Sequence, residues 1–431
     1  MSTIAPVMQP AVKPAPARIP TDWTTTSMQG RIRRRYRAER RFRMLGAGAV
    51  LLSTAFLIFL LVSMLSQGLR GFTQTELKLP MDFPAARLGI DPAALAGPNA
   101  RAILAAVDLE NATAQAANRA YGDGGYKLLS DGAWLSIRAA IQDDPAILTR
   151  RADIWVPTST AIDLAAKTDA DPDAEAGYRL LDAKQAVRTG FSMAFLTGAD
   201  STDPTLVGMW GALKGSLLTM FVTLVLAFPV GVLSALYLEE YAPRNRWTDL
   251  IEVSINNLAA VPSIIFGLLG LAVFLNFLDF PRSAPIVGGL TLALMTMPVI
   301  VIAGRNAIKS VPPSIRDAAL GIGASKVQVV FHHVLPLALP GILTGTIIGM
   351  ARALGETAPL LMIGMRAFIA SPPGGLTDPA TVLPVQIFLW SDEVSRGYVE
   401  KTSAAIIVLL VFLLAMNGIA IYLRNRFERR W

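Results

Sequence analysis

The sequence contains no cysteine and only two histidines, which are adjacent at His332 and His333. The lack of cysteine excludes disulfide bonds, and it excludes zinc or iron–sulfur sites with cysteine ligands. Two neighbouring histidines do not favour a Ser-His-Asp site or a multi-histidine metal site. The sequence therefore predicts no catalytic residue, no metal ligand and no cofactor.

Charge is also scarce along the 431 residues. Charged residues make up 16% of the chain and hydrophobic residues 53%, whereas soluble domains average about 25% and about 45–50%. This composition excludes a disordered or collagenous chain and an ordinary cytosolic protein. It predicts a membrane protein with some soluble mass attached.

The N-terminal region combines a polar tail, an arginine run and a first apolar segment. Residues 1–30 are rich in Pro, Thr and Ala and are predicted to be disordered. Residues 31–43 carry eight arginines, a run that nucleic-acid-binding arms and signal peptides also show. The uncharged segment 44–65 is long enough to cross about 30 Å of hydrocarbon, too long for a signal peptide, and followed by a poor cleavage site. We expect a retained membrane helix with its arginines in the cytoplasm.

Residues 66–205 have a different character. They hold 18 acidic and 13 basic residues and several turn signals. The segments 126–130 and 153–157 alternate like short strands, whereas 93–97 and 99–121 have helical patterns. The segment follows a single span, so we expect an extracytoplasmic domain with a mixed α/β fold and no catalytic constellation.

Five further apolar segments are long enough to cross a membrane, which makes six spans in total. They are Ala212–Leu238, Ile255–Leu278, Ala284–Ala303, Gly341–Gly364 and Ala404–Tyr422. An even number of spans returns the chain to the side on which it began. The short segments then placed inside are rich in Arg and Lys, as the positive-inside rule requires. We therefore expect both termini in the cytoplasm, and the net charge of +7 needs no nucleic acid to explain it.

Small residues recur every four positions in one span, at Gly341, Gly345, Gly349 and Ala353. Such a stripe lets a second helix approach closely. Glycine is common in membrane helices, but the fixed spacing favours a helix interface here.

The loop 306–340 is the most informative stretch. Pro312 and Pro313 stop the preceding helix, and Ser314 is a candidate cap for a short helix that places Ile315, Ala318, Ala319 and Ile322 on one side. A second short helix is expected from Ser325 to Val334, ended by Leu335-Pro336. The pair predicts either a knob that docks a partner or an amphipathic hairpin that lies on lipid.

This loop resembles the EAA loop of binding-protein-dependent ABC importer permeases. The match comprises Asp317-Ala318-Ala319, then Gly323, then Leu335-Pro336. Asp317 replaces the usual glutamate, and His333 stands where isoleucine is usual. The resemblance implies that the loop docks into a cleft on an ATP-hydrolysing subunit.

A narrower resemblance is to the phosphate-specific permeases called PstA, in the extended form with a large insert after the first span. It covers about residues 206–425, and its sharpest motif is Arg-Ala-Leu-Gly-Glu-Thr-Ala-Pro at 352–359. It implies an all-α membrane protein with six transmembrane helices of the type I ABC importer permease kind, with a MetI-like core. The implied partners are a PstC-like second permease chain, a PstB-like ATPase dimer, a PstS-like periplasmic phosphate-binding protein, phosphate and membrane lipid.

The expected organisation has five parts in the bacterial inner membrane. These are a basic cytoplasmic tail, the first transmembrane helix, the extracytoplasmic segment, the permease core with five spans, and a cytoplasmic tail, at 1–43, 44–65, 66–205, 206–425 and 426–431.

Arg352 and Glu356 are expected one helical turn apart inside a span, where ionisable groups are costly and usually functional. A guanidinium fits phosphate oxygens, Glu356 would hold Arg352 in place, and Thr357 could add a hydroxyl donor. The alternative is an ion pair that only locks the helix. Arg305 is a weaker candidate for the path, with a snorkelling topology anchor as its alternative.

Three functions stay open. The first is a phosphate importer permease that is not an enzyme, since the chain has no Walker A pattern and ATP hydrolysis would fall to a partner. The second is a permease of the same architecture for molybdate, sulfate or an amino acid. The third is a membrane-anchored sensor or scaffold that uses residues 66–205 to bind an external ligand.

Overall fold

The computed structural model describes residues 24–86, 88–97, 100–168, 171–366, 368–369 and 371–427. Most of the predicted N-terminal tail and the last four residues lie outside these ranges. The structure is mostly helical with one small sheet, as the sequence predicted. The chain divides into two units after Ser63.

The first unit consists, in its described part, of the long helix α1, Thr26–Gly71, up to Ser63. The helix begins 18 residues before Met44, so the arginine run is helical, and so are residues 26–30, which were expected to be disordered. The apolar side chains of α1 are exposed, for example Leu51 and Phe56 at 70% and 61%. An exposed apolar helix of this length is suited to lipid or to a partner helix.

The second unit contains a sheet domain, Thr73–Thr197, built on three antiparallel strands. The strand β1, Thr73–Asp82, lies between β2, Arg151–Pro157, and β3, Val187–Phe191. Alternate β1 residues Leu77, Leu79 and Met81 are at most 1% exposed, since one face of the sheet forms the domain core. The helices of this domain are α2 Phe83–Ala86, α3 Ala100–Ala105, α4 Leu109–Tyr121, α5 Ala133–Asp143, α6 Thr160–Lys167, α7 Pro172–Ala183 and α8 Met193–Thr197.

The predictions for this domain were partly right. The segment 153–157 is the end of β2, and 99–121 contains α3 and α4, with Asp108 capping α4 through the backbone N–H of Asn111. The segment 126–130 is not a strand, because residues 125–128 form a 3₁₀ turn and only Leu129 makes a bridge, to Thr158. The 93–97 segment lies largely in another 3₁₀ turn, Pro92–Ala96.

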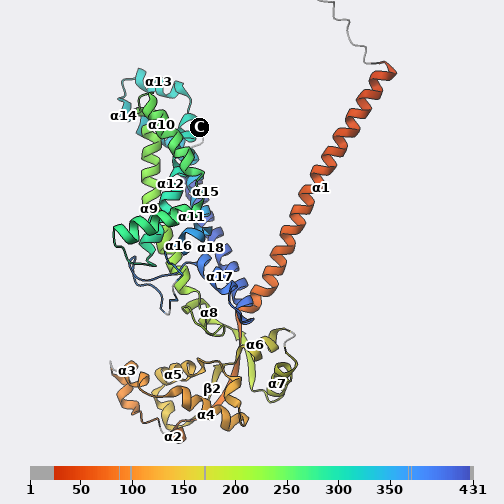
Figure 1. Cartoon of the computed structure of the whole chain (residues 1–431), viewed down its shortest axis with the longest axis vertical. Helices are drawn as coiled ribbons and strands as arrows, with labels where there is room; N and C mark the ends of the chain where they lie inside the picture. The colour runs from red at the N-terminus through yellow and green to blue at the C-terminus, as the bar shows by residue number, and fades with distance from the viewer. Residues whose placement is uncertain are drawn as a thin grey trace, which may run out of the picture. The chain divides into compact units, whose positions relative to one another are not determined.

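Four long helices form the membrane bundle. They are α9 Trp210–Leu236, extended by the π-helical turn η4 Tyr237–Tyr241, then α12 Pro285–Lys309, α15 Leu335–Gly355 and α18 Gly397–Phe427. The helix α12 packs against both α9 and α15, and α15 packs against α18 (Figure 1). Within the part of the chain that the structure describes, these helices and α1 make five that are long and apolar enough to cross a membrane, and a bent pair would make six.

That bent pair corrects the span expected at 255–278. Residues Arg246–Ala259 form α10, and residues Ser263–Phe277 form α11 with the π-helical segment η5, bent by 100° from α10. Pro262 lies at the break, where its ring and missing N–H prevent α10 from continuing.

The span expected at 341–364 is also displaced. A continuous 30-residue helix runs from Lys326 to Gly355 through α14, Lys326–Gln328, and the π-helical segment η6, Val329–Val334. Leu335-Pro336 was therefore wrongly expected to end a helix. The π turn directly before Pro336 adjusts the backbone locally, as membrane helices do where a proline removes a hydrogen bond. Beyond Gly355 the chain turns into the short helices α16, Ala358–Met362, and α17, Leu383–Ser391.

Buried charged groups join the sheet domain to the first turns of α18. The Lys167 ammonium, 4% exposed, donates to Asp163 Oδ2 at 2.6 Å and to the Thr73 carbonyl at 2.7 Å, and it lies 3.6 Å from Glu400 Oε2. The Tyr398 hydroxyl donates to the Ser201 carbonyl oxygen. A buried lysine or carboxylate is costly without a partner of opposite charge. The contact between Lys167 of α6 and Glu400 of α18 therefore fixes the position of these two helices against each other.

Candidate functional site

The loop after α12 folds into a short helix and a turn. The helix α13, Pro313–Gly321, begins after Pro312 rather than at a Ser314 cap, and no side chain caps its first turn. Gly323 has a φ of +89°, a backbone conformation that glycine adopts without strain. Ser325 then caps the long helix with a reciprocal capping box to Gln328. The turn at Gly323 thus sets the direction in which the chain continues from α13 into α14.

The outer surface of this loop carries several large exposed apolar residues among polar ones such as Lys326 and Gln328. Leu320, Ile322, Val327 and Phe331 are exposed by 47%, 83%, 56% and 45%. Asp317 and Ala318 are exposed beside them. We call these six residues the coupling surface; α13 and α14 lie at one end of the bundle, away from α17 (Figure 1). Exposed apolar residues gathered next to a small residue and one acid suit a protein partner.

The opposite side of α13 packs on the bundle. Ala319 is 4% exposed and joins the core that includes Val329 and Val330, with Ile315 packed against it. The expectation that Ala318 and Ile322 share this face was wrong, because Ile322 lies beyond the end of α13. Leu335 and Pro336 are half-buried in the helix that follows. The helix α13 therefore has one face packed on the bundle and one face exposed.

The glycine stripe on α15 faces α12, as its spacing predicted. A Cβ on Gly341 would lie 2.7 Å from Ala307 Cβ, and a Cβ on Gly345 would collide with Ala303 Cβ. Ala353 is fully buried. The two helices approach closely enough here that a larger side chain would force them apart.

The predicted path residues lie at the end of α15. Arg352 Nε donates to Glu356 Oε1 at 3.4 Å, although α15 ends at Gly355 and Glu356 is already outside the helix. The Arg352 side chain is 51% exposed and that of Glu356 is 17% exposed. Thr357 is half-buried at the start of α16. About half of the Arg352 side chain is thus accessible to a ligand or to another chain.

Arg305 lies elsewhere. Its guanidinium contacts Glu239 Oε1 at 2.5 Å and Glu252 Oε2 at 2.8 Å, and it is 11% exposed. Gly341 faces Ala307 and Gly345 faces Ala303, so Arg305 lies about two and a half turns of α15, roughly 13 Å, from the level of Arg352. The structure therefore does not bring the two arginines together.

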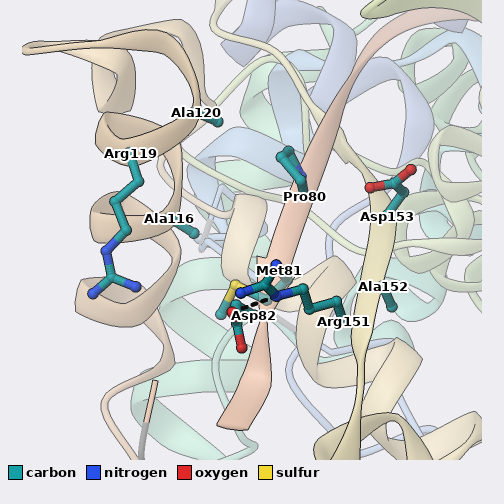
Figure 2. Close-up of a pocket in the computed structure, with 9 residues that line it drawn as sticks. All are labelled: Pro80, Met81, Asp82, Ala116, Arg119, Ala120, Arg151, Ala152 and Asp153. Carbon is teal, nitrogen blue, oxygen red and sulfur yellow. Dashed lines mark hydrogen bonds and ion pairs between the residues drawn. The ribbon is translucent and has the colours of Figure 1, made fainter. Parts of the chain in front are cut away.

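A separate concavity of about 450 Å³ lies on the sheet domain, between α4 and the strands β1 and β2 (Figure 2). Arg151 reaches across it and donates to Asp82 Oδ2 at 2.6 Å, while Asp153 pairs with Lys78 at 2.8 Å. The backbone N–H of Ala85, and then Arg151, hold the pKa of Asp82 below its usual value. Asp82 and Arg151 thus neutralise each other, whereas Asp153 pairs with Lys78, outside the lining, and Arg119 donates to Gln115.

Within the residues that the structure describes, no group of three or more His, Asp or Glu side chains could hold a metal ion.

Comparison with protein families identifies the family to which the helical part of the chain belongs. The family "Binding-protein-dependent transport system inner membrane component" matches residues 211–431, about half of the chain. The protein belongs to this family. It is a multi-pass membrane permease of the ABC transporter type, a class that is not itself catalytic. A second family, "Domain of unknown function (DUF3333)", matches residues 29–176 and so covers much of α1 and of the sheet domain.

Several curated relatives resemble the family region. The chain is 32% identical over 209 residues to the probable ABC transporter permease protein YqgI of Bacillus subtilis, covering 46% of this chain and 70% of the relative. It is 30% identical over 235 residues to the phosphate transport system permease protein PstA of Yersinia pestis, covering 54% and 77%. It is 37% identical over 156 residues to PstA 1 of Mycobacterium tuberculosis, covering 36% of this chain and about half of the relative, 51%.

Among solved structures, a chain of the MetNI methionine ABC transporter in inward-facing conformations matches 52% of this chain and 95% of its own length. The identity is 19% and the TM-score 0.38.

Sequence reasoning missed Glu239 and Glu240 as site residues. Both side chains are 12% exposed, and each pairs with an arginine on another element. Two successive acids at the end of an apolar segment, in a chain short of charge, were the signal that could have identified them.

Proposed function

We propose that this permease moves inorganic phosphate through the membrane as one subunit of an ATP-driven importer. The similarity to PstA proteins of several bacteria supports phosphate as the substrate. The observation that carries the coupling part of the proposal is the coupling surface, an exposed apolar patch at one end of the bundle. An ATPase subunit that covers this patch would deliver the energy of its nucleotide cycle to the helices.

The assembly follows from this role. The permease would pair with a second permease chain and bind an ATPase dimer at the coupling surface. An external phosphate-binding protein would deliver phosphate on the other side. The arginine-rich start of α1 and the end of α18 would lie in the cytoplasm, and the sheet domain outside.

Arg352 is our candidate contact with phosphate inside the membrane. A guanidinium donates hydrogen bonds that replace those a phosphate anion loses when it leaves water. Glu356 keeps the Arg352 side chain oriented, and its negative charge limits how tightly an anion is held. Transport requires such limited binding, because the ion must leave again.

The test uses the assembled complex in proteoliposomes. Arg352→Gln should lower ATP-driven phosphate uptake about tenfold, the loss expected for one charge-assisted hydrogen bond, with assembly unchanged. Arg282→Gln, at an exposed turn, is the matched control and should retain normal uptake. Normal uptake by Arg352→Gln would remove this residue from the path.

A permease of the same type for another oxyanion is the second candidate. Sulfate and molybdate present the same oxygens to a guanidinium, so Arg352 alone would not distinguish them. Competition for uptake by these anions separates the two candidates.

A further inference from the structure

Arg316, a residue of α13, connects this helix to the turn η4 that extends α9 and to the C-terminal end of α12. It precedes Asp317 in α13 and is 22% exposed. Its Nε and Nη2 atoms donate to Glu240 Oε1 at 3.1 and 2.7 Å. Its Nη1 donates to the Val311 carbonyl oxygen at 2.7 Å, and its Nη2 donates to the Ile308 carbonyl oxygen at 3.1 Å. One side chain thus holds the end of α9 and satisfies carbonyls at the C-terminal end of α12.

The neighbouring carboxylate, that of Glu239, forms a second set of ionic contacts. Glu239 accepts a hydrogen bond from Arg305 of α12 at 2.5 Å, and Lys309 lies 3.4 Å away. The other end of the Arg305 guanidinium pairs with Glu252 of α10 at 2.8 Å. The end of α9 is therefore tied to α10, α12 and α13 by charged groups.

The π-helical turn η4 carries both acids, and as successive helical residues their side chains point in different directions. Residues Tyr237–Tyr241 follow α9 directly, and the wider turn changes the direction of both carboxylates relative to an α-helix. Both carboxylates are nearly buried, and buried ion pairs contribute little net stability over an apolar replacement. Separating either pair would leave a buried charge without a partner, so the two pairs restrict the arrangement of the helices.

We propose that Glu239 and Glu240, with Arg305 and Arg316, form a charged relay that makes α13 and the cytoplasmic end of α9 move as one body. The proposal deepens the proposed function, because it rests on α13 receiving the movement of the ATPase. Without these ion pairs, α13 would move over the surface of the bundle, and its movement would not reach the membrane helices. The four residues are positioning residues, since none of them needs to contact phosphate.

The direct test is a distance measurement in the assembled complex. The chain has no cysteine, so introduced cysteines carry the only spin labels on this subunit. One pair, Ser314→Cys with Tyr241→Cys, joins α13 to the end of α9; a second pair, Ser314→Cys with Ile419→Cys, joins α13 to α18. All three positions are exposed.

The distances are compared with and without ATP trapped on an ATPase subunit that cannot hydrolyse it. The α13–α9 distance should stay constant while the α13–α18 distance changes. Glu240→Gln should make the α13–α9 distance vary with nucleotide. A nucleotide-dependent α13–α9 distance in the native background, or no effect of Glu240→Gln, would overturn the relay.

Transport provides the second readout. Glu240→Arg should lower the amount of phosphate imported per ATP hydrolysed about tenfold, and the double variant Glu240→Arg, Arg316→Glu should restore at least half of it. The exposed pair Arg179–Glu175 on α7 gives the control, because Glu175→Arg should leave the ratio unchanged. Equal loss in the single and double variants would contradict an ionic relay.

The two proposals fail separately. If the native complex hydrolyses ATP without importing phosphate, the proposed substrate is wrong. The spin-label distances still decide the relay in that case, since they require only nucleotide.

Discussion

The ammonium group of Lys401 in α18 donates a hydrogen bond to the backbone carbonyl oxygen of Gly71, 2.9 Å away, at the end of α1. Lys401 is 3% exposed, and its Nζ also lies 4.9 Å from the centre of the Phe195 ring. A Cβ on Gly71 would collide with the Glu400 backbone, so the two helices are in close contact at this point. The last span, the end of the first helix and the sheet domain thus meet at one lysine.

Lys401→Met should destabilise the protein by about 1–3 kcal/mol, because it removes the donor to a buried carbonyl and the positive charge near Glu400. The measurement is thermal unfolding of the purified full-length protein in detergent. Lys184→Met, at an exposed position, is the control and should change stability by less than about 0.5 kcal/mol. Equal effects of the two substitutions would show that the Lys401 contact contributes nothing specific.

Gly345→Val should separate α15 from α12, because the stripe leaves no room for a side chain opposite Ala303. Overpacking of this kind costs about 1–3 kcal/mol. Gly418→Ala on α18 is the control, since a Cβ there meets nothing within 4 Å. Unfolding in increasing denaturant should distinguish them, and wild-type stability of Gly345→Val would mean that the helices can move apart freely.

Ile322→Asp should weaken binding of the ATPase subunit at least tenfold without lowering the stability of the permease, because Ile322 is 83% exposed. Val394→Asp introduces the same change at a 98% exposed position next to α17 and should bind the ATPase normally. Co-purification of the tagged permease with the ATPase measures the effect. Undiminished co-purification of Ile322→Asp would exclude the coupling surface as the docking site.

Acid should weaken the sheet domain through Asp82. Its pKa is lowered in the folded protein by the Ala85 N–H and by Arg151, so its contribution to stability is fully present above the usual aspartate pKa and is lost as the pH falls through the lower pKa of the folded state. Asp82→Asn should therefore flatten the dependence of unfolding on pH in the acid range. An unchanged acid dependence in Asp82→Asn would assign the effect to other carboxylates.

Much of the fold could be predicted from sequence because the membrane demands long apolar helices. The stripe from Gly341 to Ala353 indicated which face of α15 meets another helix, since small residues at that spacing let a second helix approach closely. The bend at Pro262 was not foreseen, because a proline in an apolar run is compatible with a kinked span or with two helices.

Other features depended on partners that are distant in sequence. Strand β1 was not predicted although Leu77, Leu79 and Met81 alternate with polar residues, and Pro80 inside the run is the one residue that argues against a central strand. The pairing of Glu240 with Arg316 joins residues 76 positions apart, and no local pattern predicts it. Arg352 and Glu356 pair as expected, but Glu356 lies just beyond the last residue of α15, so the two do not share one helix as the four-residue spacing predicted.

The most direct test of the proposed function is uptake of radiolabelled phosphate by proteoliposomes that contain the permease, its partner chain, the ATPase and the external binding protein. We expect accumulation that requires ATP and that excess sulfate or molybdate does not reduce. Accumulation that these anions abolish, or ATP hydrolysis with no phosphate entering the vesicles, would contradict a phosphate permease.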